Sequence, residues 1–128
     1  MPKATTSGSE TQHFDLKTLP DGYVVIRRMT YGEFLRRRQM TSNMKFEAQK
    51  GEKDFQGTME LLNKAAIEYE FGNCIVEHNL EDDDGKLLNF KKVADIEKLD
   101  PRIGDEINER INEMNQFEED EEGNSGAA

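Results

Sequence analysis

The stretch DPRIGDEINERINEM, residues 100–114, decides how the C-terminal part of this chain folds. Asp100 is a strong helix N-cap, and Pro101 is well tolerated at the first helical position, where its missing N–H would have no partner. Apolar residues then recur every three or four positions, at Ile103, Ile107, Ile111 and Met114. This spacing predicts a helix over residues 101–117 whose apolar face packs on the rest of the domain or on a partner. The opposite face is predicted to be charged and solvated, with Arg102, Asp105, Glu106, Glu109, Arg110 and Glu113.

Three elements are predicted upstream of this helix. Residues 23–26 are β-branched or aromatic and follow a Pro-Asp-Gly turn, which indicates a short strand. Thr30 and Glu33 have the spacing of a capping box, so a helix is expected from there to about residue 50. A second helix is expected over residues 58–78, and apolar residues on more than one of its faces are typical of the central helix of a bundle.

An acidic turn and a short helix are predicted between the second and the last long helices. Asp84-Gly85 is a pair typical of a type I′ turn. The turn does not fit a calcium-binding loop, because Leu80 and Lys91 would occupy the first and last ligand positions. We therefore interpret it as a solvated turn, and the apolar spacing over residues 92–99 indicates a short helix after it.

Together these elements predict a mainly α fold, a small helical domain over residues 14–117 with a minor short strand or hairpin. Residues 1–13 are rich in Ser, Thr and Gly, which predicts a disordered N-terminal arm. Residues 118–128 begin with five successive acidic side chains, and their mutual repulsion predicts a disordered acidic tail. A chain of 128 residues is expected to form one domain.

The charge of the chain limits its partners. A net charge of −10 disfavours binding to nucleic acid or to anionic membranes. Residues 1–50 hold nine Lys/Arg and five Asp/Glu (+4), whereas residues 51–128 hold eight and twenty-two (−14), which sum to −10. This polarity suits a homo-oligomer or a partner with a basic patch. With one cysteine, no run near the ~18 apolar residues of a membrane span and no signal-peptide core, we expect a soluble intracellular protein.

No motif of the chain indicates catalysis. A Gly-rich phosphate loop, a nucleophile elbow and an HExxH motif are all absent from the sequence, so we expect no enzyme activity and no cofactor. Cys74 and His78 share a predicted helix face, but two ligands do not make a zinc site, and no metal is expected. The arginines at 36–38 fan around a helix, so solvation or internal salt bridges are favoured over a protein partner, and a protein partner over nucleic acid.

Residues 23–118 resemble the tail assembly chaperones of long-tailed bacteriophages. The resemblance rests on the order of short motifs: MTYGEFL at 29–35, HNL at 78–80, DDGKLL at 83–88, LDPRI at 99–103 and EMN at 113–115 beside an acidic tail. Such chaperones coat the tape measure protein before the tail tube polymerises around it, and they leave before the tail is complete. A longer, frameshifted form adds a domain that recruits tube subunits in many phages.

The resemblance implies a tape measure protein as partner, with the tail tube protein as a second candidate. It also implies action in the host cell cytoplasm and absence from the mature virion. It offers no catalytic residues, so candidate contacts are chosen by their chemistry, because methionine and large apolar side chains adapt to helical partners. The candidates are Phe34, Met40 and Met44 on the first helix and Ile107, Ile111 and Met114 on the last. If the apolar stripes close on each other, these residues form the core instead.

Two other functions remain compatible with the sequence. A virion structural adaptor, such as a head–tail connector or a tail completion protein, would use the charge polarity for contacts within a ring. An acidic inhibitor of a host nucleic-acid enzyme would need its acidic side chains on one folded face. Many of them lie in a turn and in the tail, which disfavours the inhibitor.

Overall fold

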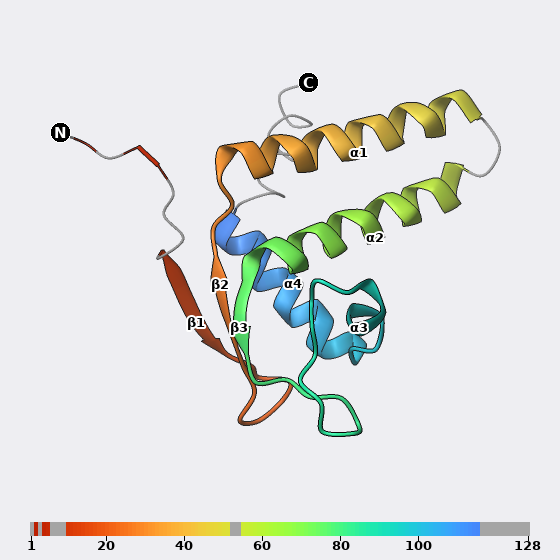
Figure 1. Cartoon of the computed structure of the whole chain (residues 1–128). Helices are drawn as coiled ribbons and strands as arrows, with labels where there is room; N and C mark the ends of the chain where they lie inside the picture. Colours follow the sequence, from red (N-terminus) through yellow and green to blue (C-terminus); the bar gives the residue numbers. More distant parts are fainter. Residues whose placement is uncertain (1, 3, 6–9, 52–54, 116–128) are drawn as a thin grey trace.

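The computed structural model describes residues 2, 4, 5, 10–51 and 55–115 (Figure 1). In chain order the elements are β1 (Thr11–Asp15), β2 (Tyr23–Arg27), α1 (Tyr31–Gly51), α2 (Phe55–Cys74), β3 (Ile75–His78), α3 (Val93–Glu97) and α4 (Pro101–Asn115). The strands form one antiparallel sheet in the order β1-β2-β3. The prediction of a mainly α fold is therefore wrong, because the described part of the chain is a mixed α/β fold.

Two of the three strands were not predicted. β1 includes residues 11–13, which the sequence had assigned to a disordered arm, and the predicted acidic tail lies outside the described residues. β3 occupies the last four residues of the helix predicted over 58–78, and α2 ends at Cys74. The β-branched residues Ile75 and Val76 suit a strand once β2 lies beside them, and this pairing between distant segments leaves no mark in helical periodicity.

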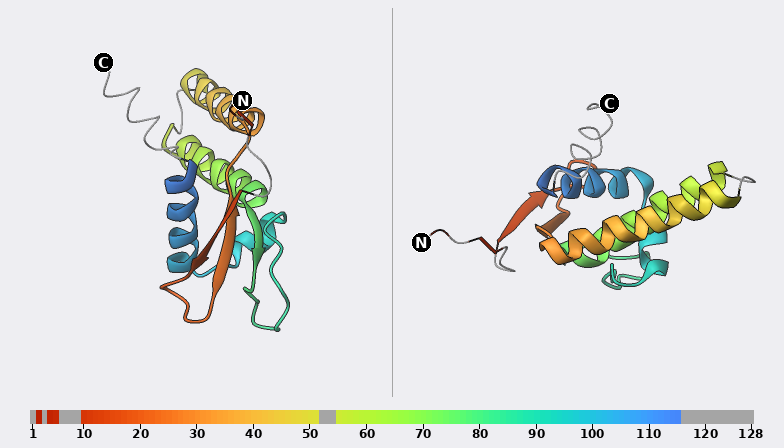
Figure 2. Two further views of the ribbon diagram at one scale, coloured as in Figure 1. Left: turned by 90° about the vertical axis from the view of Figure 1, so that its left-hand side faces the viewer. Right: turned by 90° about the horizontal axis from the view of Figure 1, so that it is seen from above.

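The predicted strand at residues 23–26 is confirmed as β2, the central strand of the sheet. Its side chains alternate, so that Val24 and Ile26 are buried on one face of the sheet. α4 packs on this face and places Ile107 and Ile111 in the same core. Figure 2 shows α4 running along one side of the sheet.

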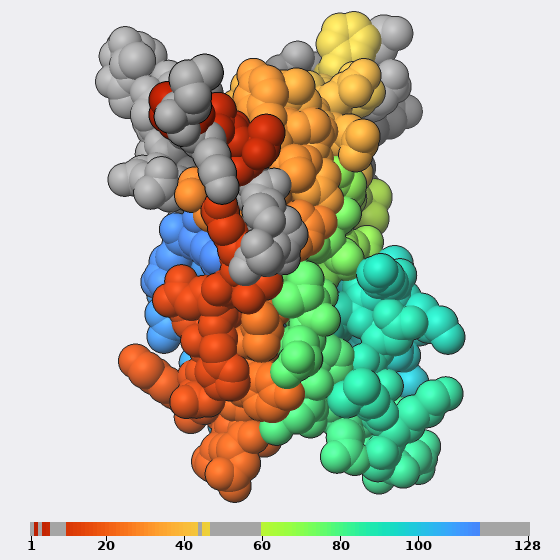
Figure 3. Space-filling model, turned by 60° about the vertical axis from the view of Figure 1, so that its left-hand side comes forward, coloured from red at the N-terminus to blue at the C-terminus, as the bar shows by residue number. Residues whose placement is uncertain are grey.

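The other face of the sheet lies at the molecular surface, where the three strands run side by side (Figure 3). The Tyr23 hydroxyl donates a hydrogen bond to Glu77 Oε2 at 2.8 Å, and the His13 ring stacks on Tyr23 with ring centroids 4.8 Å apart. The bond to Glu77 raises the pKa of Tyr23, assisted by burial. Helices pack on the apolar face of such a sheet, while its polar face stays in contact with water. α1 and part of α2 therefore do not pack on the sheet.

α1 and α2 form an antiparallel helical hairpin that projects beyond the sheet (Figures 1 and 2). The predicted capping box is confirmed at the start of α1. The Glu33 N–H donates to Thr30 Oγ1 at 3.2 Å, and the Thr30 N–H donates to Glu33 Oε1 at 3.0 Å. The Tyr69 hydroxyl, on α2, donates to the Glu33 carbonyl at 3.2 Å and ties the two helices together near the sheet.

The last helix begins where the sequence predicted, with the Arg102 N–H donating to Asp100 Oδ1 at 2.9 Å. Its charged face contains one exception. Glu106 is buried, and its carboxylate accepts hydrogen bonds from the Lys17 N–H (2.8 Å), the Thr18 N–H (2.9 Å) and the Thr18 hydroxyl (2.6 Å). Burial acts to raise the pKa of Glu106, but these hydrogen bonds outweigh it and lower the pKa. Glu106 thus fastens the β1–β2 connection to α4, a role that the helical periodicity could not indicate.

The acidic turn closes differently from the predicted type I′ turn. That turn needs positive φ at both central residues, whereas only Gly85 has positive φ here, at 77°. The Asp82 carboxylate accepts hydrogen bonds from the amides of Asp84 (2.9 Å) and Lys86 (3.0 Å), and the Gly85 N–H donates to the Asp82 carbonyl at 3.0 Å. The Asp82 side chain therefore stabilises the turn by hydrogen bonds to its backbone amides. Gly85 occupies the one position of the turn with a left-handed backbone conformation.

Candidate partner-binding surfaces

The candidate contacts on α4 lie in or against the core. Ile107 and Ile111 are 0% exposed, and Met114 is partly buried against the same cluster. A side chain with no exposed area cannot contact a partner while this fold persists. The assignment of Ile107 and Ile111 to a partner surface is therefore wrong, because the stripe that the sequence left unpaired is covered by the sheet and by α2.

The candidates on α1 are divided between the core and the surface. Phe34 packs against the core, and the Arg38 guanidinium lies over its ring at 4.7 Å from the centroid. Met40 is half-buried, and the side chain of Met44 lies outside the described part of the structure. Among the candidates whose side chains the structure describes, Met40 is the one that neither belongs to the core nor packs against it.

Besides Tyr31 at the start of α1, three large apolar residues among the described side chains of the hairpin are exposed and are not among the candidates. Leu35 is 41% exposed, Phe46 58% and Leu61 59%. Phe46 and Leu61 lie near the connection between α1 and α2, where the hairpin projects farthest from the sheet (Figure 1). The sequence held a signal for Leu61, because it precedes the buried Leu62 by one residue and so points about 100° away from it around the helix.

The end of the hairpin next to the sheet is held by ion pairs. Arg27 donates to both carboxylate oxygens of Glu33, at 2.9 and 2.6 Å. This pair, together with the bonds from Thr30, lowers the pKa of Glu33 to about 2 against the opposing effect of burial. The Nε atom of Arg37, on α1, lies 3.4 Å from Oε2 of Glu70, a buried residue of α2. Arg27 and Arg37 thus form internal ion pairs, and Arg38 contacts Phe34 within α1.

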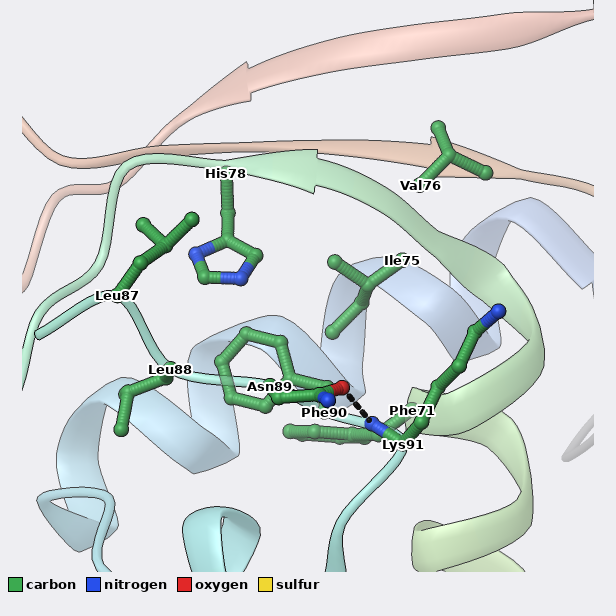
Figure 4. A pocket seen from close by; sticks show the side chains of 9 residues that line it. All are labelled: Phe71, Ile75, Val76, His78, Leu87, Leu88, Asn89, Phe90 and Lys91. Atoms are coloured by element: carbon green, nitrogen blue, oxygen red, sulfur yellow. Dashed lines mark hydrogen bonds between the residues drawn. The ribbon is translucent and has the colours of Figure 1, made fainter.

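A pocket of about 380 Å³, here called the β3 pocket, lies between β3 and the segment Leu87–Lys91 (Figure 4). Its lining is mostly apolar: Phe71, Ile75, Val76, His78, Leu87, Leu88, Asn89, Phe90 and Lys91. Figure 4 shows the side chains of Ile75 and His78 pointing from β3 toward Phe90. The ring centroids of His78 and Phe90 lie 4.6 Å apart, and the Leu80 N–H donates a hydrogen bond to His78 Nδ1 at 3.0 Å. Burial lowers the pKa of His78, while a backbone hydrogen bond with Leu88 acts in the opposite direction.

Two further hollows differ in charge. One of about 490 Å³ shares three lining residues with the β3 pocket and continues it, and it is lined by Arg27, Gly72, Asn73, Ile75, Val76 and Lys91. The other, of about 420 Å³, has an acidic rim over an apolar floor, with Leu19, Leu80, Glu81, Asp82, Asp83, Leu88, Lys98, Leu99, Asp100 and Ile103. The first is cationic and the second is mainly anionic.

Residues suited to chemistry are few in the described part of the chain. Cys74 is buried, and burial followed by the charge of Glu70 raises the pKa of its thiol to about 12, which removes the reactive thiolate at neutral pH. Within residues 10–51 and 55–115, no three His, Cys, Asp or Glu side chains are grouped so that they could hold a metal ion. None of the described helices is long and apolar enough to cross a membrane.

Comparisons with protein-family models, with curated proteins and with solved structures gave no match to this chain.

Proposed function

We propose that this chain is a tail assembly chaperone that binds a tape measure protein and keeps it soluble until the tail tube forms. The resemblance of residues 23–118 to such chaperones supports the proposal. The observation that carries it is the α1–α2 hairpin, which projects from the sheet with Leu35, Phe46 and Leu61 exposed. The chain would act in the host cell cytoplasm, would be absent from the mature virion, and would have the tail tube protein as a second partner.

The hairpin suits an amphipathic helical partner. Each of its exposed apolar side chains would contribute when buried against a partner helix, at roughly 25 cal/mol per Å² of apolar area removed from water. Few such side chains are exposed among those that the structure describes on α1 and α2, which favours an interface that can be released when the tube assembles. The net charge of −10 would keep copies on a common partner soluble.

The proposal is tested by co-expressing the full chain with the tape measure protein from the same genome. Size-exclusion chromatography with light scattering should give a soluble complex with many copies per partner, although the partner alone aggregates. Leu61→Asp should reduce the copies bound at least several-fold. Val93→Asp is the matched control, because Val93 is 44% exposed but lies on α3, and it should leave the stoichiometry unchanged.

Two outcomes would contradict the proposal. One is the absence of a complex together with a discrete ring formed by this chain alone, which would favour the virion structural adaptor. The other is a complex in which Leu61→Asp and Val93→Asp behave alike, since the hairpin would then not be the contact surface.

A further inference from the structure

β3 is an edge strand with an open side. β2 pairs with it on one side, and in Figure 4 the segment Leu87–Lys91 lies on the other. Within the described residues, no backbone hydrogen bond joins β3 to this segment. The backbone groups on the outer edge of β3 therefore have no backbone partner in this segment, and an open edge of this kind is what an added strand requires.

The size of the opening matches a short extended peptide. Four residues of β3 span about 13 Å at a rise of roughly 3.3 Å per residue. The hollow that continues the β3 pocket past Ile75 extends the path toward Arg27. A segment of four to six residues would fill it, with alternate side chains directed toward Phe71 and Phe90, whose rings meet edge to face at 5.7 Å.

The rim carries apolar side chains exposed to water. Leu87 is 57% exposed and Val76 is 49% exposed. They belong to opposite sides of the opening, one on the segment after the acidic turn and one on β3. A bound peptide would cover Leu87, which gives an apolar gain in addition to the strand hydrogen bonds, whereas the Val76 side chain points away from Phe90 in Figure 4.

The charge of the residues that line the β3 pocket and its continuation indicates which charge a bound peptide should carry. The chain has 27 Asp and Glu against 17 Lys and Arg, yet the linings of the β3 pocket and of its continuation contain Lys91 and Arg27 and no acidic residue. Arg27 is paired with Glu33, whereas the Lys91 side chain reaches toward the start of β3 (Figure 4). A carboxylate on the peptide would therefore be favoured at this end of the opening.

We propose that the β3 pocket and its continuation bind an extended segment of a partner protein as a fourth strand of the sheet. The segment has apolar residues at alternate positions and an acidic residue beside Lys91. This site is separate from the hairpin surface, so it stands whether or not the chain is a tail assembly chaperone.

The test uses the full chain and a displayed library of random seven-residue peptides. Selection should enrich peptides that alternate apolar residues and carry Asp or Glu. Lys91→Glu and Leu87→Glu should each weaken their binding at least tenfold, whereas the controls Lys92→Glu and Val93→Glu, exposed and outside the lining, should change it less than twofold. NMR should place the shifted amides at residues 75–78 and 87–91, with slower amide exchange in β3.

Three results would overturn this inference. The first is a library that yields no enriched peptide, or peptides without an acidic residue. The second is equal weakening by Lys91→Glu and Lys92→Glu. The third is that Lys91→Glu, without any peptide, shifts the amides of residues 116–128, because the chain's own acidic segment would then be the occupant. Leu61→Asp should leave peptide binding intact, which separates this site from the hairpin.

Discussion

The sheet with α4 and the α1–α2 hairpin use apolar residues in opposite ways. α4 carries a regular stripe, and the sheet and α2 bury it so completely that Ile107 and Ile111 have no exposed area. The hairpin carries a ragged set of apolar residues and leaves Phe46 and Leu61 more than half exposed. The strongly amphipathic helix of this chain thus packs inside the molecule, and the exposed apolar side chains of the hairpin lie on helices whose apolar pattern is weaker.

The largest predicted effect is on the free energy of unfolding, which should fall much more for a substitution in α4 than for one in the hairpin. Ile111→Ala removes a fully buried side chain and should reduce the free energy of unfolding by about 2–5 kcal/mol. Leu61→Ala removes an exposed one and should change it by less than about 0.5 kcal/mol. Urea denaturation followed by circular dichroism measures both. Equal losses would show that the hairpin belongs to the same cooperative core.

The next prediction concerns the ion pair where the hairpin meets the sheet. Glu33→Gln leaves the Arg27 guanidinium without its carboxylate and should destabilise the fold by about 1.5–3 kcal/mol at pH 7. The pKa of Glu33 falls from 4.5 to about 2 on folding, so its contribution is complete above pH 4.5 and is lost as the pH falls toward 2. Unfolding measured from pH 6 to pH 2.5 should show this loss in the wild type and a flatter profile in Glu33→Gln.

A smaller effect is expected for the buried carboxylate of α4. Glu106→Gln keeps the shape of the side chain but replaces one acceptor oxygen by a donor, which leaves an amide of Lys17 or Thr18 without a good partner. We expect a loss of about 1–2 kcal/mol. Hydrogen exchange should become faster at the amides of residues 17 and 18, and unchanged exchange there would contradict the assigned contact.

The smallest predicted effect is a pH dependence from His78. Folding lowers the pKa of His78 below 6.5, so the unfolded chain binds more protons there and stability falls as the pH drops below 6.5. His78→Asn retains an acceptor for the Leu80 amide but does not titrate. The difference in unfolding midpoint between pH 7.5 and pH 5.5 should therefore be larger in the wild type than in His78→Asn.

Part of this fold could be predicted from local sequence. The start of α4 at Asp100-Pro101, the cap at Thr30 and the strand β2 depend on neighbouring residues, and the structure confirms them. The end of α2 also had a local signal, because Gly72 and Asn73 are residues that favour a helix C-terminus. β1 had none, since Thr11–Asp15 contains one large apolar residue and forms a strand because β2 pairs with it.

The candidate sites were less predictable than the fold, for a related reason. Whether Ile107 packs inside or outside depends on a sheet formed by residues 29 to 96 positions away along the chain. The buried role of Glu106 and the opening beside β3 also come from segments that meet only in three dimensions. Periodicity shows that a helix has an apolar face, but it does not show which element covers that face.

The proposed role of the hairpin can be tested by hydrogen–deuterium exchange of the free chain and of its complex with the tape measure protein. We predict that binding slows exchange in α1 and α2 near Phe46 and Leu61, while α4 exchanges slowly in both states. Faster exchange in α4 on binding, with no added protection in the hairpin, would show that the apolar stripe of α4 opens to the partner, and it would contradict binding through the hairpin.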